Sequence, residues 1–234
     1  MRVKICGITS VDEIEMLNRN RPDYAGFVIY EKSRRFIEPD RVAELFKGLD
    51  ATIKKVAVTV SPDLRRIKTL IRLGFDIIQI HGKLEYDILK EAAVPVWRAI
   101  NLKQPDELNK GGSMKDLLQI SVEPEKEEDE SYILGIDHSM IDAVVLDAPV
   151  WGSGKSFSWE PDDADTIKRF VDRTGKEFVL AGGLTPGNVA EGISVFEPDI
   201  VDVSSGVELE SKRIPAGKDE EKIRAFIENA HGAV

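Results

Sequence analysis

The sequence predicts an α/β fold that consists of a single (β/α)8 barrel, and three observations lead to that fold class. Eight short apolar segments of strand length recur along the 234 residues, and segments of helical period separate them. No glycine-rich dinucleotide turn follows the first or second apolar segment, which speaks against a doubly wound open sheet, the competing fold class. We therefore expect residues 1–234 to form one barrel domain.

The eight predicted strands are mostly near-continuous apolar runs, as expected for parallel strands that are covered on both faces. They comprise Val3–Gly7, Tyr24–Tyr30, Lys54–Val60, Ile77–His81, Val94–Ile100, Ala143–Asp147, Glu177–Gly183 and Ile200–Ser205.

The helices between the strands are marked by apolar residues three and four positions apart. Three groups of residues show this spacing: Leu64, Ile67, Leu70 and Ile71; Ile167, Phe170 and Val171; and Ile223, Phe226, Ile227 and Ala230. Ser61-Pro62 and Thr185-Pro186 each place a capping residue before a proline at the first helical position. These two dipeptides therefore predict where two of the helices begin.

One connection is much longer than the others and covers residues 101–141, between the fifth and sixth predicted strands. It contains Gly111-Gly112-Ser113 and the acidic run EPEKEEDE at 123–130, which has the composition of a solvated segment. We expect a charged surface extension. A lid over the site is the alternative, because the connection leaves from the C-terminal end of the barrel, but an acidic lid would repel an anionic substrate.

Charge and cysteine content limit the partners and the compartment. The net charge of −10 and the pI of about 5.0 argue against nucleic acid and anionic membranes as partners. A single cysteine, Cys6, excludes an intrachain disulfide, and no apolar stretch approaches the ~18 residues of a membrane-spanning helix. Arg2 and Lys4 interrupt any apolar leader at the start of the sequence. We expect a cytoplasmic protein.

Glycines and serines lie at the ends of the last two predicted strands, as Gly182-Gly183 and Ser205-Gly206. Glycine lets the backbone approach a ligand closely, and barrels often bind phosphate in the loops after strands seven and eight. A Gly-Gly pair alone more often marks a turn. The two positions together predict a phosphate site.

Strand alternation places a thiol and a carboxylate at the mouth of the barrel. Lys4 and Cys6 share one face of the first strand and should point inward, because the apolar Ile5 between them should face the helices. Asp147 should point inward for the same reason, next to an outward Leu146. A buried cysteine is usually an inert small hydrophobe. A lysine on the same face favours the thiolate, and together with the opposing acid it indicates a catalytic pair.

The fourth strand adds Gln79 and His81, which share its inward face. We expect His81 either to be structural or to donate or accept a hydrogen bond at the site; no Cys/His/Asp spacing around it predicts a metal site. Arg98, near the end of the fifth strand, is expected either to meet a ligand anion or to pair inside the barrel. Asp202, before the last serines, is expected to be structural.

Six motifs together resemble the phosphoribosylanthranilate isomerase family of tryptophan biosynthesis. They are KICGIT, GFVIYEKSRRFI, IQIHG, VVLDAPVWGSGKSFSW, FVLAGGLTPGNV and DVSSGVE…AGKDEEKIRAF, in order along nearly the whole chain. AGGL alone occurs in other phosphate-binding barrels, whereas the full set is specific to this family.

The resemblance implies an aldose–ketose isomerase that needs neither cofactor nor metal. By an Amadori rearrangement, such an enzyme converts the small phosphosugar N-(5-phosphoribosyl)anthranilate to 1-(2-carboxyphenylamino)-1-deoxyribulose 5-phosphate. The family's general base corresponds to Cys6 and its general acid to Asp147. The arginine that binds the anthranilate carboxylate corresponds to Arg35, or to the adjacent Arg34, because YEKSRR replaces the usual YPKSPR, with Glu31 at the first proline position.

The remaining candidates for substrate binding are Lys4, His81, Gly182, Gly183, Ser205 and Gly206. Two alternative functions are weighed against the isomerase. The related isomerase of histidine biosynthesis uses two aspartates, whereas the first strand here offers a cysteine. A non-catalytic phosphate-binding barrel would have no use for an inward thiol and an inward carboxylate together. The sequence leaves the choice between a monomer and a homodimer open.

Overall fold

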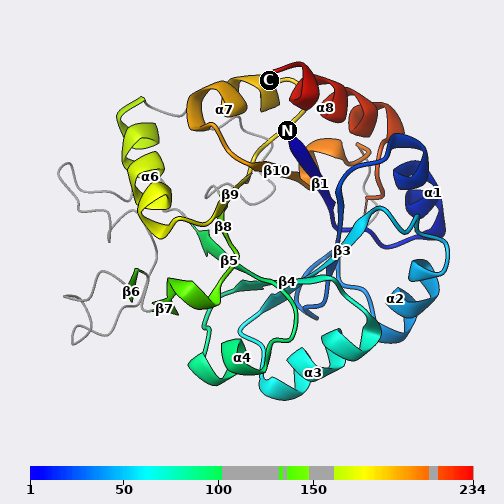
Figure 1. Cartoon of the computed structure of the whole chain (residues 1–234). Helices are drawn as coiled ribbons and strands as arrows, with labels where there is room; N and C mark the ends of the chain where they lie inside the picture. The colour runs from blue at the N-terminus through cyan, green and yellow to red at the C-terminus, as the bar shows by residue number, and fades with distance from the viewer. Residues whose placement is uncertain (102–131, 134–135, 148–160, 211–215, 234) are drawn as a thin grey trace.

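Eight parallel strands close into a barrel in the computed structural model of the chain, in the order β1-β10-β9-β8-β5-β4-β3-β2 (Figure 1). The structure describes residues 1–101, 132–133, 136–147, 161–210 and 216–233. The barrel strands are β1 Arg2–Cys6, β2 Tyr24–Val28, β3 Lys54–Val60, β4 Ile77–His81, β5 Val96–Asn101, β8 Ala143–Asp147, β9 Glu177–Ala181 and β10 Ile200–Val203. Each strand pairs in parallel with both neighbours, which confirms the predicted fold class.

The predicted strands match best where they begin. β3, β4 and β8 have the predicted bounds, and β2, β9 and β10 begin at the predicted residue but end two residues earlier than predicted. After β9 the reason is visible in the backbone, because Gly182 and Gly183 have φ values of 83° and 65°. A backbone in this left-handed region leaves the extended geometry of the sheet, so these glycines form a loop instead of extending the strand.

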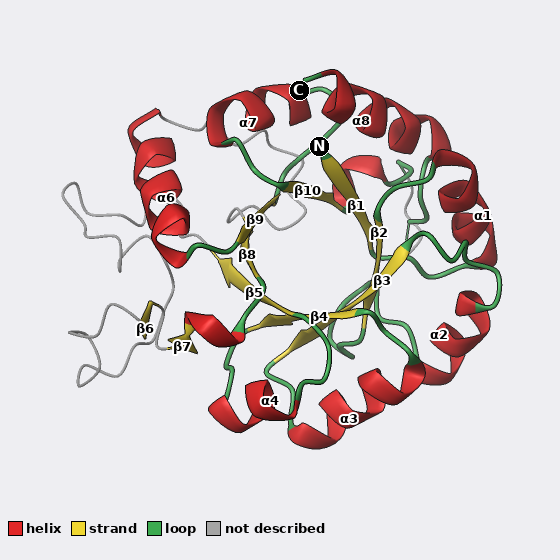
Figure 2. Cartoon of the chain, in the orientation of Figure 1, coloured by secondary structure: helices red, strands yellow, loops and turns green. Residues whose placement is uncertain are grey.

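Helices form a ring around the barrel (Figures 1 and 2). They are α1 Val11–Asn20, α2 Pro39–Phe46, α3 Leu64–Leu73, α4 Tyr86–Glu91, α6 Pro161–Thr174, α7 Val189–Phe196 and α8 Glu220–Gly232, with short 3-10 turns η3 His138–Met140 and η4 Ser205–Val207.

The predicted long connection contributes a two-stranded antiparallel ribbon, β6 Tyr132–Ile133 and β7 Ile136–Asp137, which lies outside the barrel (Figure 1). Its glycine pair and its acidic run at 123–130 lie outside the described residues.

The predicted helix start at Ser61-Pro62 is wrong. α3 begins at Leu64, with the side chain of Asp63 as its cap. Ser61 instead has φ 44°, and its Oγ accepts a hydrogen bond of 2.8 Å from the Lys83 N–H after β4. A tertiary contact between two loops at the barrel mouth therefore replaces the expected local cap.

The predicted start at Thr185-Pro186 is also wrong, because α7 begins three residues later, at Val189. A hydrogen-bonded turn precedes the helix: the Thr185 carbonyl accepts from the Val189 N–H at 3.1 Å, and Asn188 Oδ1 accepts from the Thr185 N–H at 2.7 Å. The Thr-Pro pair thus begins this turn and not the regular helix.

Two apolar layers confirm the strand alternation predicted from the sequence. Ile5 and Leu146 belong to the larger core between strands and helices. Cys6 belongs to a smaller cluster inside the barrel. In the same inner cluster Tyr24 and Trp97 pack edge to face, with ring centroids 5.1 Å apart. The barrel interior is therefore a packed core.

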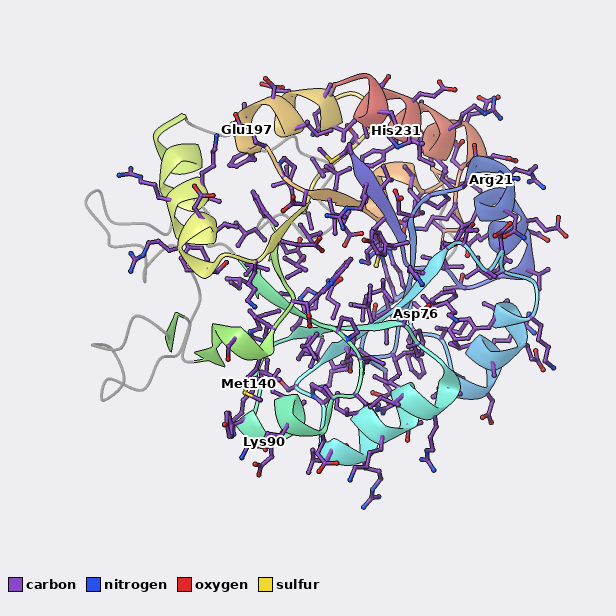
Figure 3. The ribbon with its side chains drawn as sticks, viewed as in Figure 1. Arg21, Asp76, Lys90, Met140, Glu197 and His231 are labelled. Atoms are coloured by element: carbon purple, nitrogen blue, oxygen red, sulfur yellow. The ribbon has the colours of Figure 1, made fainter. Side chains whose placement is uncertain are left out.

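Charged side chains gather on the outer surface of the helical ring. Arg21, Lys90, Glu197 and His231 are exposed and lie along the outer margin in Figure 3. None of the helices that the structure describes is long and apolar enough to cross a membrane.

Candidate active site

A cavity of about 510 Å³ lies among the C-terminal ends of the barrel strands. This volume is within the range of ~300–1,000 Å³ that is usual for small-molecule sites. The cavity brings together eight of the predicted site residues: Cys6, Arg34, Arg35, His81, Asp147, Gly182, Gly183 and Ser205. Lys4 and Gly206 do not line it and lie behind the residues that do.

The thiol of Cys6 is seated at the end of β1, beside Gly26 of β2. A Cβ at position 26 would lie 2.7 Å from Cys6 Sγ, so only glycine leaves room for the sulfur there. Burial raises the pKa of Cys6 above its ordinary value, and the neighbouring Lys4 opposes the rise. The sulfur is thus held at the cavity with a cation beside it.

Lys4 and Asp202 form an ion pair of 2.6 Å between β1 and β10. The Lys4 side chain is fully buried. Burial lowers the pKa of Lys4, but Asp202 and Cys6 outweigh this effect and leave it raised. The second carboxylate oxygen of Asp202 is buried, has no hydrogen-bond partner among the described residues, and belongs to a residue that lines the cavity. The ion pair agrees with the expected structural role of Asp202, and the second oxygen adds a buried acceptor at the cavity that the sequence did not indicate.

Asp147 ends β8 and lines the same cavity as Cys6. Protein surrounds this carboxyl on most sides, and burial raises its pKa to about 7, with a further increase from the charge of Asp202. Lys4 and Arg35 act in the opposite direction. A large fraction of Asp147 is therefore protonated at neutral pH and is able to act as an acid.

The two glycine loops follow β9 and β10, which lie between β8 and β1 in the barrel, and so line the cavity between Asp147 and Cys6. Gly182, Gly183 and Ser205 line it, after β9 and at the start of η4. A Cβ at Gly206 would lie only 1.9 Å from the Leu184 carbonyl oxygen, so the two loops approach each other more closely than any side chain at 206 would allow. Gly206 thus supports the loop arrangement from behind the lining.

Both arginines of the β2 loop pair with one carboxylate. Arg35 Nε donates to Glu208 Oε1 at 2.5 Å, and Arg34 Nη2 donates to Glu208 Oε2 at 3.0 Å. Arg35 is mostly buried, with 13% of its side chain exposed, whereas Arg34 is 45% exposed. Arg35 is the better placed of the two for a ligand inside the cavity.

Gln79 and His81 are buried neighbours on the inward face of β4. Gln79 Nε2 and His81 Nε2 lie 3.0 Å apart, and both residues line the cavity. Gln79 Oε1 has no hydrogen-bond partner among the described residues. An unpaired buried acceptor is costly unless a ligand or water satisfies it, so Gln79 joins the candidate binding residues.

Both expectations for Arg98 are wrong. It alternates with Val96 and Ile100, which belong to the outer core, and it does not line the cavity. Its Nη1 donates to the Ile80 carbonyl at 3.3 Å, and burial lowers its pKa to about 10. The alternation of Trp97 and Ala99 into the inner cluster explains why the arginine between them faces the helices.

Glu208 and Lys218 were not identified from the sequence. Lys218 Nζ is buried 3.5 Å from Glu208 Oε1 and donates to the Ser204 carbonyl at 3.0 Å. These residues come from the segment after β10, and no local pattern in the sequence there shows that the two side chains meet. The inward direction of Asp202 could have been predicted, because it lies two residues after Ile200, which points into the barrel.

Within the described part of the chain, no three His, Cys, Asp or Glu side chains gather in a way that would hold a metal ion.

Comparisons with known proteins agree with this geometry. The family model for N-(5'phosphoribosyl)anthranilate (PRA) isomerase matches residues 3–121 and 117–229. The N-(5'-phosphoribosyl)anthranilate isomerase of Streptococcus gordonii is 33% identical over 234 residues, which cover 100% of this chain and 99% of that protein.

Two solved structures are similar over 99% of both chains. The phosphoribosyl anthranilate isomerase of Thermotoga maritima has a TM-score of 0.74 at 28% identity. A second structure has a TM-score of 0.71 at 26% identity and is of a phosphoribosyl anthranilate isomerase in complex with reduced 1-(o-carboxyphenylamino)-1-deoxyribulose 5-phosphate. Since the family model and the relatives span nearly the whole sequence, the chain belongs to the N-(5'-phosphoribosyl)anthranilate isomerase family of enzymes.

Proposed function

We propose that the chain isomerises N-(5'-phosphoribosyl)anthranilate to 1-(o-carboxyphenylamino)-1-deoxyribulose 5-phosphate in tryptophan biosynthesis, with Cys6 as general base and Asp147 as general acid. One observation carries this proposal: the thiol and the carboxyl with a pKa of about 7 line a single cavity at the barrel mouth. An Amadori rearrangement needs one group that gives a proton and another that takes one.

Asp147 acts first, as the acid. Its proton goes to the furanose ring oxygen, the bond from that oxygen to C1′ breaks, and the sugar opens to a protonated Schiff base. An ether oxygen is a weak base, so this step needs a carboxylic acid that is still protonated near neutral pH. The raised pKa of Asp147 supports this role.

Cys6 acts second, as the base. Its thiolate takes the proton from C2′, and the electron pair left behind moves toward the iminium nitrogen to give an enolamine, which tautomerises to the ketone. The positive charge of the opened Schiff base favours the thiolate, as does Lys4, which lowers the pKa of Cys6 against the effect of burial.

The remaining residues bind and orient the substrate. Gly182, Gly183 and Ser205 offer backbone and hydroxyl groups to the phosphate, and Arg35 pairs with the anthranilate carboxylate. Gln79 and His81 hydrogen-bond the sugar hydroxyls. A thiol base must stay reduced, so the proposal includes a cytoplasmic location.

The test is to incubate the purified chain with freshly made phosphoribosylanthranilate and to follow the loss of its anthranilate fluorescence. We expect saturable turnover that yields the aminoketose. Binding of the substrate without turnover would indicate a non-catalytic phosphate-ligand barrel and contradict the proposal.

A further inference from the structure

Glu208 joins the two arginines of the β2 loop to the segment that follows η4. One of its oxygens accepts from Arg35 Nε and the other from Arg34 Nη2. Its side chain is only 10% exposed, so this is a mostly buried contact between two loops at the cavity and not a surface ion pair. Glu208 therefore contacts both arginines at once.

The backbone around Glu208 is held on several sides. Its own N–H donates to the Ser205 carbonyl at 3.1 Å, and its carbonyl accepts from Lys222 Nζ at 3.1 Å. The flanking residues pair with the opposite segment: Leu209 N–H donates to the Gly217 carbonyl at 3.0 Å, and Asp219 N–H donates to the Val207 carbonyl at 2.9 Å. The backbone at Glu208 is therefore held in place, and its carboxylate can orient the longer side chain of Arg35.

The side chain of Arg35 crosses the end of β1 to reach Glu208. Gly7, next to Cys6, has φ 83°, and a Cβ there would lie 2.5 Å from Arg35 Cδ and 3.4 Å from its Nε. The stem of Arg35 therefore passes over the backbone of Gly7, next to the thiol. Glycine at this position is needed both for the backbone conformation and for the passage of the arginine.

Three cations surround the single carboxylate of Glu208, so the net charge there favours binding of a second anion. Arg34, Arg35 and Lys218 surround one carboxylate, and Lys218 is 1% exposed. Burial raises the pKa of Glu208, but Arg35 and the other cations outweigh burial and leave it below its usual range. Within the described residues, the Arg35 side chain donates only from Nε and only to Glu208. Its two terminal nitrogens can therefore donate a pair of hydrogen bonds to a planar anion such as a carboxylate.

We infer that Glu208 is a positioning residue for carboxylate recognition, which holds Arg35 over Gly7 so that its terminal nitrogens bind the aromatic carboxylate of the substrate. This inference rests on the proposed function. It keeps the carboxylate with Arg35, as proposed above, and gives Arg34 the role of contacting Glu208 from the rim of the cavity.

The experiment measures selectivity for the carboxylate by direct binding. Two ligands are titrated by calorimetry: reduced 1-(o-carboxyphenylamino)-1-deoxyribulose 5-phosphate and its anilino analogue without the carboxyl group. We expect the unaltered chain to bind the first about 10–100-fold more tightly, the range for charge-assisted hydrogen bonds. Glu208→Ala should lower this ratio at least about tenfold. Glu208→Gln keeps an acceptor for Arg35 Nε and should lower it no more than about threefold.

Turnover provides a second readout. In Glu208→Ala, KM for the carboxylated substrate should rise about tenfold or more while kcat changes less than about threefold, because the proton-transfer groups stay in place. A merely structural role would lower the population of folded protein and affect both ligands equally.

The matched control is Glu220→Ala. Glu220 accepts from Arg19 Nε and Nη2 at 2.8 and 2.9 Å, between α8 and α1 and away from the cavity lining. This variant loses an arginine–glutamate pair of the same type and should keep the ligand ratio unchanged.

An unchanged ratio in Glu208→Ala, or tighter binding of the carboxylated ligand, overturns the inference, as does an unaltered chain that does not distinguish the two ligands. An unaltered chain that discriminates the ligands and loses this discrimination in Glu208→Ala, but shows no turnover, supports the inference and refutes the proposed function. A chain that binds neither ligand refutes both.

Discussion

Asp147 and Cys6, the two groups proposed to exchange protons with the sugar, hold their own protons more tightly than they would in water. Burial raises the pKa of Asp147 to about 7 and raises that of Cys6 above its ordinary value. In the proposed mechanism the active form has a protonated Asp147 and an ionised Cys6, although Asp147 has the lower pKa of the two and loses its proton first. It is therefore a minor form of the free enzyme at every pH.

This order of pKa values predicts the pH profile of kcat/KM. Below pH ~7 Asp147 is protonated and the thiolate fraction rises with pH, so kcat/KM rises. Above the pKa of about 7 for Asp147, loss of its proton cancels the gain in thiolate, and kcat/KM levels off until the raised pKa of Cys6 is passed. The fluorescence assay between about pH 5 and about pH 11 measures this profile. A decline of kcat/KM that begins near neutral pH would contradict the assignment.

At the same residue scale, the sequence predicted that Cys6 and Asp147 point into the barrel mouth, but not which residues surround them. Cys6 and Asp147 each follow an outward apolar residue, Ile5 and Leu146, so their direction followed from neighbours in the chain. Glu208 and Arg35 are 173 residues apart in the sequence, and no local sequence pattern predicts a contact between them. Arg98 was misplaced because its strand was read without deciding which of its faces is the inner one.

At the scale of elements, β1 carries two cations in very different settings. Lys4 is fully buried with Asp202 of β10 as its partner, whereas Arg2 pairs at 2.9 Å with Glu177 of β9, and these side chains are 37% and 45% exposed. Removing one member of a buried pair leaves an uncompensated charge, which costs more than losing an exposed pair.

We therefore expect Lys4→Met to lower the free energy of unfolding by about 3–5 kcal/mol and Arg2→Met by no more than about 1 kcal/mol. Urea denaturation at neutral pH measures both, and Arg2→Met serves as the control on the same strand. Equal losses in the two variants would show that the Lys4–Asp202 pair does not stabilise the barrel in the way its burial indicates.

The ends of the strands and helices were harder to predict than their approximate positions in the sequence. The bounds of Lys54–Val60 and Ala143–Asp147 were right, because each strand contains a buried, mainly apolar run of strand length. Ends depend on contacts from elsewhere: Ser61, the expected cap, bonds instead to the loop after β4. Local sequence cannot show a partner that only the closed barrel brings near.

For the whole molecule, the barrel follows from the repetition of strand and helix, while the 101–141 connection is an addition to that repeat. A single barrel domain over residues 1–234, and the choice between a monomer and a homodimer, stay predictions. Light scattering in solution decides the second, since one chain has a mass of 26.1 kDa.

Deletion of residues 111–130 tests the expected role of that connection. Its acidic composition would repel an anionic substrate, so we expect kcat and KM to change less than about threefold. The control is the melting temperature of the shortened chain, which shows that the barrel still folds. A collapse of kcat in a folded variant would instead support a lid over the site.

The central claim is that one thiol and one carboxyl carry the proton transfers at a single cavity, and kcat of Cys6→Ser tests it most directly. With phosphoribosylanthranilate as substrate, a serine in place of the thiol should lower kcat at least about 100-fold, as should Asp147→Asn, with KM and folding close to those of the unaltered chain. A Cys6→Ser variant with nearly full kcat would contradict the account.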